Sequence, residues 1–261
     1  MSERKITFDD GAAYERMMGT WSRIAGETFL DWLAPAKGLA WVDVGCGNGA
    51  FTESIAQRCA PTQIKGIDPS AGQIAFARSR LKDVNAEFVT GDAMALPFED
   101  KSFDVAVMAL VLFFVPDPKK GLAEMVRVTR RAGAVTAYVW DLFGGGFPAD
   151  ALQVELRAMG LPAPYPPSAE VSRMDNLRSM WVDAGLTRVD TRVIDVERSF
   201  VDFNDYWESC MLSSTIGAAV KGLPAGQVDE LKKRVRGRFG ANEGRFTASA
   251  RANAVKGWVA S

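Results

Sequence analysis

The sequence predicts an α/β fold built on a doubly wound sheet of seven strands, mostly parallel with an antiparallel edge strand. From residue 40 onward, short apolar runs alternate with helical patterns, which is typical of parallel strands joined by helical crossovers. The first apolar run leads into a glycine-rich turn and then a helical pattern, AWVDVGCGNGAFT at 40–52. The last two runs lack this alternation, so we expect them to pair as antiparallel neighbours at one edge. The predicted class is therefore Rossmann-like, with an N-terminal helical lid and a helical cap insertion.

The first 35 residues predict amphipathic helix that stops at Ala34-Pro35, because bulky apolar side chains recur at spacings of three and four. These side chains are Tyr14, Met17, Met18, Trp21, Ile24, Phe29, Trp32 and Leu33. Such a stripe either packs against the body of the domain or forms a lid over a ligand.

The predicted strands are 40–44, 63–68, 86–90, 103–109, 133–140, 187–196 and 246–255. The predicted helices lie near 49–59, 70–82, 119–131 and 173–185. Parallel sheets of this kind bind ligands beyond the carboxyl ends of their strands, where the strand order reverses. Two segments fit no crossover, the Gly- and Pro-rich 143–167 and the cap at 199–243, and long excursions of this sort are often functional.

Composition narrows the classes of partner. The chain has 261 residues, is 48% hydrophobic and carries 31 basic against 32 acidic side chains, so nothing favours a nucleic acid. The cationic run KKRVRGR at 232–238 fits a solvated helix face or a local basic patch. We find no signal peptide and no apolar stretch of about 18 residues, and therefore expect a cytoplasmic protein without stable membrane insertion.

Cysteine and histidine content excludes several kinds of chemistry. The three cysteines have no metal-ligand spacing and histidine is absent, so no metal site is expected. Histidine is also the usual general base. Any reaction must then use Asp, Glu, Tyr, Lys, Cys or a cofactor.

The turn after the first strand predicts a nucleotide-like ligand site. Glycines at 45, 47 and 49 allow positive φ and close approach of a ligand, and the amides that open the next helix point into the same gap. The turn alone is ambiguous. Gly45, Gly47 and Ala50 also fit the dinucleotide fingerprint, and a sharp turn without a ligand would need glycine as well.

Three strands deliver carboxylates to one edge of the predicted sheet. Asp43 closes the first strand. Asp68, 21 residues beyond Gly47, closes the second and can accept hydrogen bonds from both hydroxyls of a ribose. Asp92 follows the third strand, where it can accept from an adenine amino group beside the apolar Met94. Each carboxylate has a plainer alternative as a helix cap or loop side chain, Asp68 most directly because Pro-Ser follows it.

At this point the sequence resembles the class I S-adenosylmethionine-dependent methyltransferases, and within them the small-molecule group that contains ubiquinone and menaquinone biosynthesis methyltransferases. The resemblance covers about 38–140. Its motifs, in order, are DVGCGNG, GIDPS, GDAMALPFEDKSFD, FVPDP and EMVRVTRRAG. It implies one methyltransferase domain over 1–261, with a lid at 1–37, a cofactor-binding core at 38–142, an insertion and crossover helix at 143–185, and the last two strands with their cap at 186–261.

The resemblance implies a cofactor, S-adenosyl-L-methionine, and roles for individual residues. The turn at Gly45, Cys46 and Gly47 would lie under the methionine part, and Asp43 would attract its ammonium group. The ribose would be held by Asp68 beside Pro69. The remaining contacts would be the adenine ring on Gln73, the adenine edge at Asp92, Ala93 and Met94, and backbone near the sulfonium at Ala109 and Leu110. In the lid, Tyr14 or Trp21 would face the sulfonium and Arg23 would pair with the cofactor carboxylate.

The sequence departs from many relatives after the fourth strand, where it has Leu-Phe-Phe at 112–114 instead of a histidine. Methyl transfer tolerates this, because alignment of nucleophile, methyl and sulfur supplies much of the rate. If a base is needed, Asp141 and Tyr206 are the candidates, although ordinary surface and core roles suit them too. A small, partly apolar acceptor is expected. The aromatic and apolar side chains that either line its pocket or form the core of the cap are Phe143, Phe147, Phe203, Tyr206, Trp207, Met211 and Leu212.

Two other functions stay open on the sequence. An NAD(P)-dependent oxidoreductase would explain the glycine spacing and Asp68, but it would not explain Asp43, which repels a pyrophosphate. A non-catalytic cofactor-binding protein with the same fold is the second alternative.

Overall fold

A computed structural model describes residues 15–213, 216–240 and 244–261 of the chain, and it contains the expected seven-stranded sheet in the order β3-β2-β1-β4-β5-β7-β6. Neighbouring strands from β3 to β5 run parallel. The order reverses between β1 and β4, which is the switch point where such sheets bind ligands. The strands are β1 (Ala40–Val44), β2 (Gln63–Asp68), β3 (Ala86–Thr90), β4 (Phe103–Ala109), β5 (Thr129–Trp140), β6 (Thr187–Phe200) and β7 (Phe246–Trp258).

The last two strands form the expected antiparallel pair at one edge. Strand β7 runs antiparallel to both of its neighbours, β5 and β6. Because β7 lies between them, β6 is the edge strand. The small side chains Ala252 and Ala254 are fully buried at the centre of β7. Because these two side chains lie on the same face of the sheet, they let the element packed on that face approach closely.

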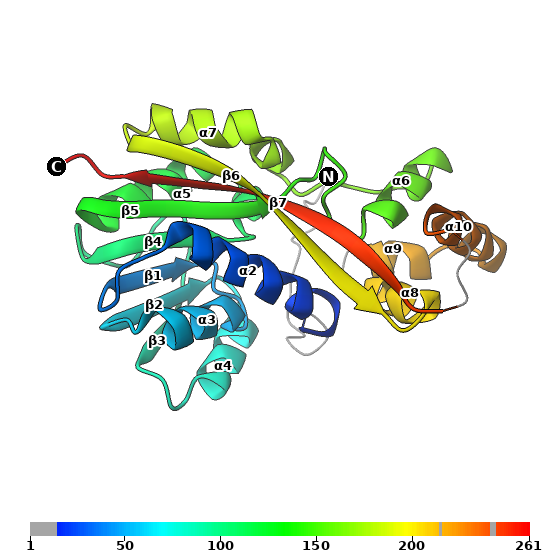
Figure 1. Ribbon diagram of the computed structural model, residues 1–261, viewed down its shortest axis with the longest axis horizontal. Coiled ribbons are helices and arrows are strands. Elements are labelled where there is room, and N and C mark those ends of the chain that lie inside the picture. The colour runs from blue at the N-terminus through cyan, green and yellow to red at the C-terminus, as the bar shows by residue number, and fades with distance from the viewer. Residues whose placement is uncertain (1–14, 214–215, 241–243) are drawn as a thin grey trace.

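Helices cover both faces of the sheet. In Figure 1, α2 and α3 lie in front of the sheet and α5 behind it, and α7 packs against β6 and β7. The helices are α2 (Thr20–Leu33), α3 (Ala50–Cys59), α4 (Ala71–Arg80), α5 (Pro118–Val128), α6 (Asp150–Ala158), α7 (Met174–Asp183), α8 (Phe203–Met211), α9 (Ile216–Lys221) and α10 (Ala225–Arg238). None of the helices in the described ranges is long and apolar enough to cross a bilayer.

The described part of the N-terminal segment is helical, as predicted, but it begins with a turn of π-helix, η1 (Glu15–Gly19). Single π-helical turns are frequent at functional sites. The α-helix that follows ends at Ala34, which adopts a left-handed conformation with φ +47°. Pro35 follows and disfavours helix at the residue before it.

Strand β5 begins four residues earlier than the sequence predicted, at Thr129 instead of 133. The helix before it therefore ends at Val128, not at 131. The reason is local. Thr129 is β-branched and extended, and its hydroxyl donates back to the Met125 carbonyl at 2.6 Å. This closes the helix while the chain turns into the sheet.

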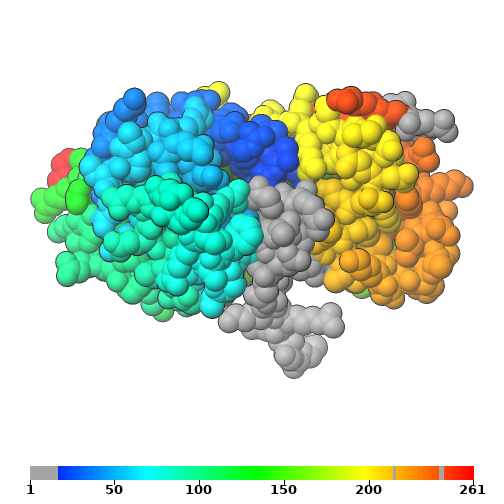
Figure 2. Space-filling model, turned by 90° about the horizontal axis from the view of Figure 1, so that it is seen from below, coloured from blue at the N-terminus to red at the C-terminus, as the bar shows by residue number. Residues whose placement is uncertain are grey.

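The cap inserted between β6 and β7 contains α8, α9 and α10. Its core is aromatic: the Tyr206 ring lies 5.2 Å from Phe200 and 4.9 Å from Phe239. Glu155 of α6 pairs with Arg238 of α10 at 2.6 Å and so joins the insertion to the cap. In Figure 2 the cap forms a mass of its own beside the cofactor-binding core, with the start of α2 touching both.

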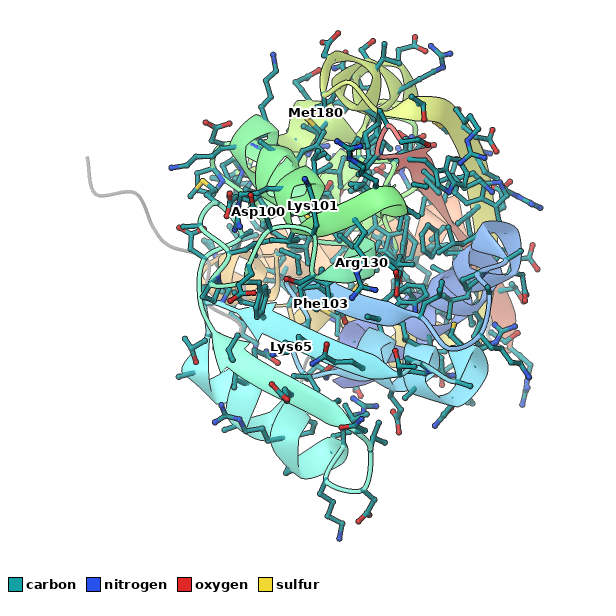
Figure 3. All side chains as sticks on the ribbon, turned by 90° about the vertical axis from the view of Figure 1, so that its left-hand side faces the viewer. Lys65, Asp100, Lys101, Phe103, Arg130 and Met180 are labelled. Atoms are coloured by element: carbon teal, nitrogen blue, oxygen red, sulfur yellow. The ribbon has the colours of Figure 1, made fainter. Side chains whose placement is uncertain are left out.

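The opposite end of the sheet, where the parallel strands begin, is closed by hydrogen bonds. Figure 3 views this end, with Phe103 at the start of β4 and Arg130 at the start of β5. Arg130 pairs with Asp104 at 2.8 Å, and the other Asp104 oxygen accepts the Ala40 N–H at 2.8 Å. Three strands are thereby fixed at this end, and the candidate site residues gather at the other.

Candidate functional site at the carboxyl ends of the strands

The turn that follows β1 adopts the glycine conformations that the sequence predicted. Gly45, Gly47 and Gly49 have φ of +78°, +51° and +79°. The N–H groups of Gly45 and Cys46 both donate to the Ile67 carbonyl, at 2.7 and 3.0 Å. The turn is therefore held against the end of β2 by backbone hydrogen bonds, which do not depend on any side chain.

Space around the turn differs from one glycine to the next. A Cβ atom at position 45 would lie 2.4 Å from the side chain of Val111, and one at 49 would lie 2.7 Å from Leu81. At Gly47 no heavy atom lies within 4 Å of such a Cβ. The tight glycines pack the turn against protein, whereas Gly47 faces open space in which a ligand can approach the backbone.

Asp43, in β1 directly before the turn, is fully buried. Its Oδ2 atom accepts the Thr52 hydroxyl at 2.7 Å, while Oδ1 is buried and has no hydrogen-bond donor among the described residues. Burial raises the pKa of this carboxyl to about 7, with a further contribution from the negative charge of Asp68 and an opposing one from the Thr52 hydrogen bond. A buried carboxylate oxygen without a donor is costly, and a cationic ligand group would satisfy it.

Asp68 closes β2 and bonds to the turn itself. One oxygen accepts the Gly47 N–H at 3.0 Å and the other accepts the Ser70 N–H at 2.9 Å. The cap of α4 is Ser70, which accepts from Gln73 N, so the helix-cap alternative for Asp68 is wrong. Its pKa is raised, chiefly by burial and against those two backbone bonds. Pro69 is exposed and Gln73 is buried in the first turn of α4.

The third predicted carboxylate lies in a loop after β3. Asp92 is exposed and accepts the Met94 N–H at 2.8 Å. This bond is a local turn that orders the loop, and it leaves the outer carboxylate oxygen facing solvent. Ala93 and Met94 are half-buried beside it.

The end of β4 also meets the turn. Leu110 has a left-handed backbone with φ +61°, an uncommon conformation for a branched side chain, and its N–H donates to Tyr138 O at 2.8 Å. The next residue is Val111, whose side chain fills the place of a Cβ on Gly45. Ala109 and Leu110 therefore lie beside the glycine turn, on the side that faces β4.

The lid candidates do not gather around the turn. Trp21 is buried with its ring 6.3 Å from Phe200, at the end of β6. Arg23 is exposed and pairs with Glu27 at 3.2 Å on the outer face of α2. Tyr14 lies outside the described residues. The Trp21 side chain therefore lies toward the cap, away from the glycine turn.

A small apolar cavity lies where the lid, the insertion and the cap meet. Its volume is about 10 Å³, roughly room for one water molecule. It is lined by Met17, Met18, Trp21, Phe147, Pro148, Ala149, Phe200, Tyr206, Ser209, Cys210, Ser213 and Ile216. No charged side chain is among these lining residues.

The two candidate bases have structural hydrogen bonds. Asp141 accepts the Gly144 N–H at 2.8 Å in the turn after β5. The Tyr206 hydroxyl donates to the Pro148 carbonyl at 3.3 Å in the wall of the cavity. Burial raises the pKa of Tyr206 well above its ordinary value, aided by the neighbouring Cys210. The phenol therefore stays protonated at neutral pH and is a poor base.

Two residues of the site were missed by sequence reasoning. Thr52 in α3 bonds to Asp43, and Val111 after β4 contacts Gly45. Both act through side-chain contacts and belong to no sequence motif. From the sequence, Thr52 could have been identified only by its position one turn inside the predicted helix, nine residues after Asp43. Within the ranges that the structure describes, no three His, Cys, Asp or Glu side chains gather where they could hold a metal ion.

Comparisons with known proteins agree with the resemblance stated from the sequence motifs. Residues 42–137 match the family described as a methyltransferase domain. The chain is 33% identical to a demethylmenaquinone methyltransferase of Renibacterium salmoninarum over 170 residues, which cover 62% of this chain and 67% of that protein. The chain belongs to the class I S-adenosylmethionine-dependent methyltransferases.

Other matches to this methyltransferase are consistent with that membership. A demethylmenaquinone methyltransferase of Staphylococcus aureus is 39% identical over 101 residues, 38% of this chain and 42% of that protein. A putative methyltransferase of Bacillus halodurans shares the fold, with a TM-score of 0.59 at 15% identity, over 90% of this chain and 98% of that one. The resemblance stated from the motifs is confirmed, and the cofactor of this methyltransferase is S-adenosyl-L-methionine.

Proposed function

We propose that the enzyme transfers the methyl group of S-adenosylmethionine to a small, partly apolar molecule bound between lid and cap. The observation that supports this proposal is the apolar and aromatic lining at the junction of lid, insertion and cap. Because the cavity there has room for about one water molecule, the acceptor would enter only when these parts move apart. The wall of the cavity includes Met17 and Met18 from the lid, and methionine side chains adapt readily to different ligand shapes. The relatives' names point to a quinone-type acceptor as the first to test.

On the cofactor side, we infer that Asp43 holds the ammonium group and that Gly47 provides the open backbone beneath the methionine part. Asp68 keeps acceptor capacity beyond its two backbone bonds, which suits a ribose. Gln73 with Asp92, Ala93 and Met94 would surround the adenine, and Ala109 with Leu110 would flank the sulfonium. Arg23 lies on the exposed face of α2, so we do not include it.

The same division of the chain follows from these roles. We propose that 38–142 binds the cofactor, and that the lid at 1–37, the insertion at 143–185 and the cap within 186–261 form the acceptor site around it as one domain. Trp21 then belongs to the wall of the acceptor site, where it packs on Phe200.

The proposal is tested by methyl transfer. Purified protein is incubated with radiolabelled S-adenosylmethionine and either an apolar quinol or a polar, charged acceptor of similar size. We expect label only in the apolar acceptor, together with S-adenosylhomocysteine. Substituting Ile216 by Asp, which would place a charge in the cavity, is expected to abolish transfer to the quinol. Transfer to the polar acceptor alone would contradict the proposal.

The oxidoreductase and the non-catalytic protein predict other results. An NAD(P)-dependent enzyme would bind NAD(H) more tightly than S-adenosylhomocysteine in the same calorimeter. A non-catalytic protein would bind S-adenosylhomocysteine yet give no methylated product with any acceptor. Asp43 argues against a pyrophosphate, because two like charges would meet in a buried site.

A further inference from the structure

The hydrogen bond between Thr52 and Asp43 joins two side chains that are both fully buried. Thr52 lies one turn into α3, and its hydroxyl donates to Oδ2 of the carboxyl at 2.7 Å. A hydroxyl has a single proton to donate, so it determines which carboxyl oxygen is satisfied from the protein side. Oδ1, buried without a donor, is left for another partner.

Within the part of the chain that the structure describes, the groups around this carboxyl offer it no cation. From β2, the residues nearest Asp43 are its register partner Gly66 and the carboxylate of Asp68, and from β4 the register partner is Val107. The turn contributes the Cys46 thiol, whose own pKa is raised well above its ordinary value by burial and by both aspartates. α3 contributes Thr52. The ligand-free carboxyl is therefore surrounded by neutral groups and one negative charge.

An ammonium group changes this balance when it arrives at Oδ1. It supplies the missing donor and a positive charge in a buried place, where charge-assisted hydrogen bonds are strong. Both effects favour the ionised carboxylate. The O–H bond of the carboxylic acid then breaks, its proton passes to the buffer, and the carboxylate pairs with the ammonium without any change of oxidation state.

We propose that Thr52 is a positioning residue that holds Asp43 with Oδ1 toward the cofactor ammonium, and that cofactor binding releases the proton of Asp43. This inference rests on the proposed role of Asp43 in the cofactor site. It adds a residue to that site, Thr52, and a property, proton-linked cofactor affinity.

The expected pH dependence follows from linkage. Below pH 7 the bound state holds fewer protons than the free state, so affinity for S-adenosylhomocysteine should rise with pH, approaching tenfold per unit, and level off above about 7. The Thr52 hydrogen bond lowers the pKa of Asp43. Removing it raises that pKa further, so the plateau should move to higher pH.

The experiment is titration calorimetry of S-adenosylhomocysteine from pH 5.5 to 9, in pairs of buffers with different ionisation enthalpies. Wild type should release close to one proton at pH 6 and fewer as the pH rises through 7. Because the ligand amino group loses its own proton at higher pH, each variant is read as its difference from wild type at the same pH. Thr52→Val should bind several-fold more weakly at pH 7, approach wild type at pH 9 and still release protons at pH 8. Thr52→Ser should behave as wild type, and Asp43→Asn should bind weakly with no such proton release.

A matched control is Thr136→Val. Thr136 is also fully buried, and its hydroxyl donates to Val255 O at 2.8 Å in the sheet, so its loss should lower stability and leave the pH profile unchanged. If Thr52→Val does not fold, Thr52→Ala and the wild-type proton count decide the question. Proton release that is absent in wild type, or a profile that Thr52 substitution leaves unmoved, would overturn the inference with cofactor binding intact. No binding by wild type at any pH would overturn the cofactor site itself.

Discussion

At the scale of single residues, the glycines of the turn differ in what requires them. Gly45 has no room for a side chain because Val111 occupies that place, whereas Gly38, with the same φ of +78°, has no atom within 4 Å of the place that a Cβ would take. Sequence shows the same letter in both. Only the fold distinguishes a glycine needed for its backbone angle from one needed for contact.

We predict that Gly45→Ala abolishes cofactor binding and destabilises the protein by about 2–5 kcal/mol, because overpacking adds to the left-handed backbone cost. Gly38→Ala should show the backbone cost alone, about 1–2 kcal/mol, with normal cofactor binding. Urea denaturation and calorimetry measure both. Val111→Ala in the Gly45→Ala background should restore binding in part, and a double variant no better than the single one would contradict the contact argument.

Asp43 also predicts how stability depends on pH. Its pKa is raised from 3.8 to about 7 in the folded protein, so the folded state holds this proton longer than the unfolded chain. The contribution to stability is full below pH 3.8 and is lost as the pH rises through about 7, on the order of 4 kcal/mol. The free energy of unfolding of wild type minus that of Asp43→Asn should therefore fall across this range in ligand-free protein. Parallel curves for the two proteins would refute the buried, protonated carboxyl.

At the same scale, the sequence predicted the positions of the motif carboxylates but not their partners. Asp43 and Asp68 both lie at the glycine turn because each closes a parallel strand, and strand ends are readable from apolar runs. The roles of Thr52 and Val111 cannot be read in this way, because a contact across a turn leaves no periodic pattern in the sequence. Arg23, which the resemblance implies as a partner of the cofactor carboxylate, pairs with Glu27 on the exposed face of α2, and its role toward the cofactor stays a prediction.

At the scale of elements, regular alternation made β1 to β4 predictable to the residue, since glycine or proline follows β1, β2 and β3 and Ser102 precedes β4. The π-helical turn before α2 has no such signal, because its side chains continue the helical stripe. The cap was predicted as one helical insertion. Its division into α8, α9 and α10 depends on tertiary packing around Tyr206 and Phe239, which local patterns do not contain.

The cap gives a prediction of its own. Leu231 is fully buried in α10, away from the glycine turn, and Leu231→Ala should cost about 2–5 kcal/mol through the cavity it leaves. We expect a higher KM for the acceptor with an almost unchanged Kd for S-adenosylhomocysteine, because α10 packs against α6 of the insertion and lies away from the glycine turn. The exposed Val201→Ala at the end of β6 is the control and should change neither. Equal loss of both affinities in Leu231→Ala would show that cap and core respond as one unit.

The surroundings of Tyr206 predict that it does not act as a general base. Because its phenol is buried and protonated, Tyr206→Phe should keep the turnover rate within about threefold of wild type. The variant loses the long hydrogen bond to Pro148 O and the interaction with the Cys210 thiol, together about 1–2 kcal/mol of stability. If turnover instead falls by roughly two orders of magnitude, with a changed pH profile, the hydroxyl takes part in proton transfer.

At the scale of the whole molecule, ligand binding should be visible as stabilisation. S-adenosylhomocysteine at about 100 times its Kd adds about 2.7 kcal/mol, or about 5–10 °C in Tm for a chain of this size. NADH at the same concentration should leave Tm unchanged within about 1 °C. A larger shift with NADH than with S-adenosylhomocysteine would favour the dinucleotide alternative over the methyltransferase site.

The strand order has a consequence for how the chain is made. β5 and β6 are both held through β7, which comes after them and after the cap in the sequence (Figure 1). While the ribosome is still synthesising the cap, the exposed edge of β5 and the whole of β6 wait without a sheet partner, and unpaired edges invite aggregation. The parallel strands β1 to β5 can pair early, but the sheet edge and the cap beside it are completed only when β7 emerges. Nascent chains stalled before residue 246 should therefore be the ones that chaperones retain.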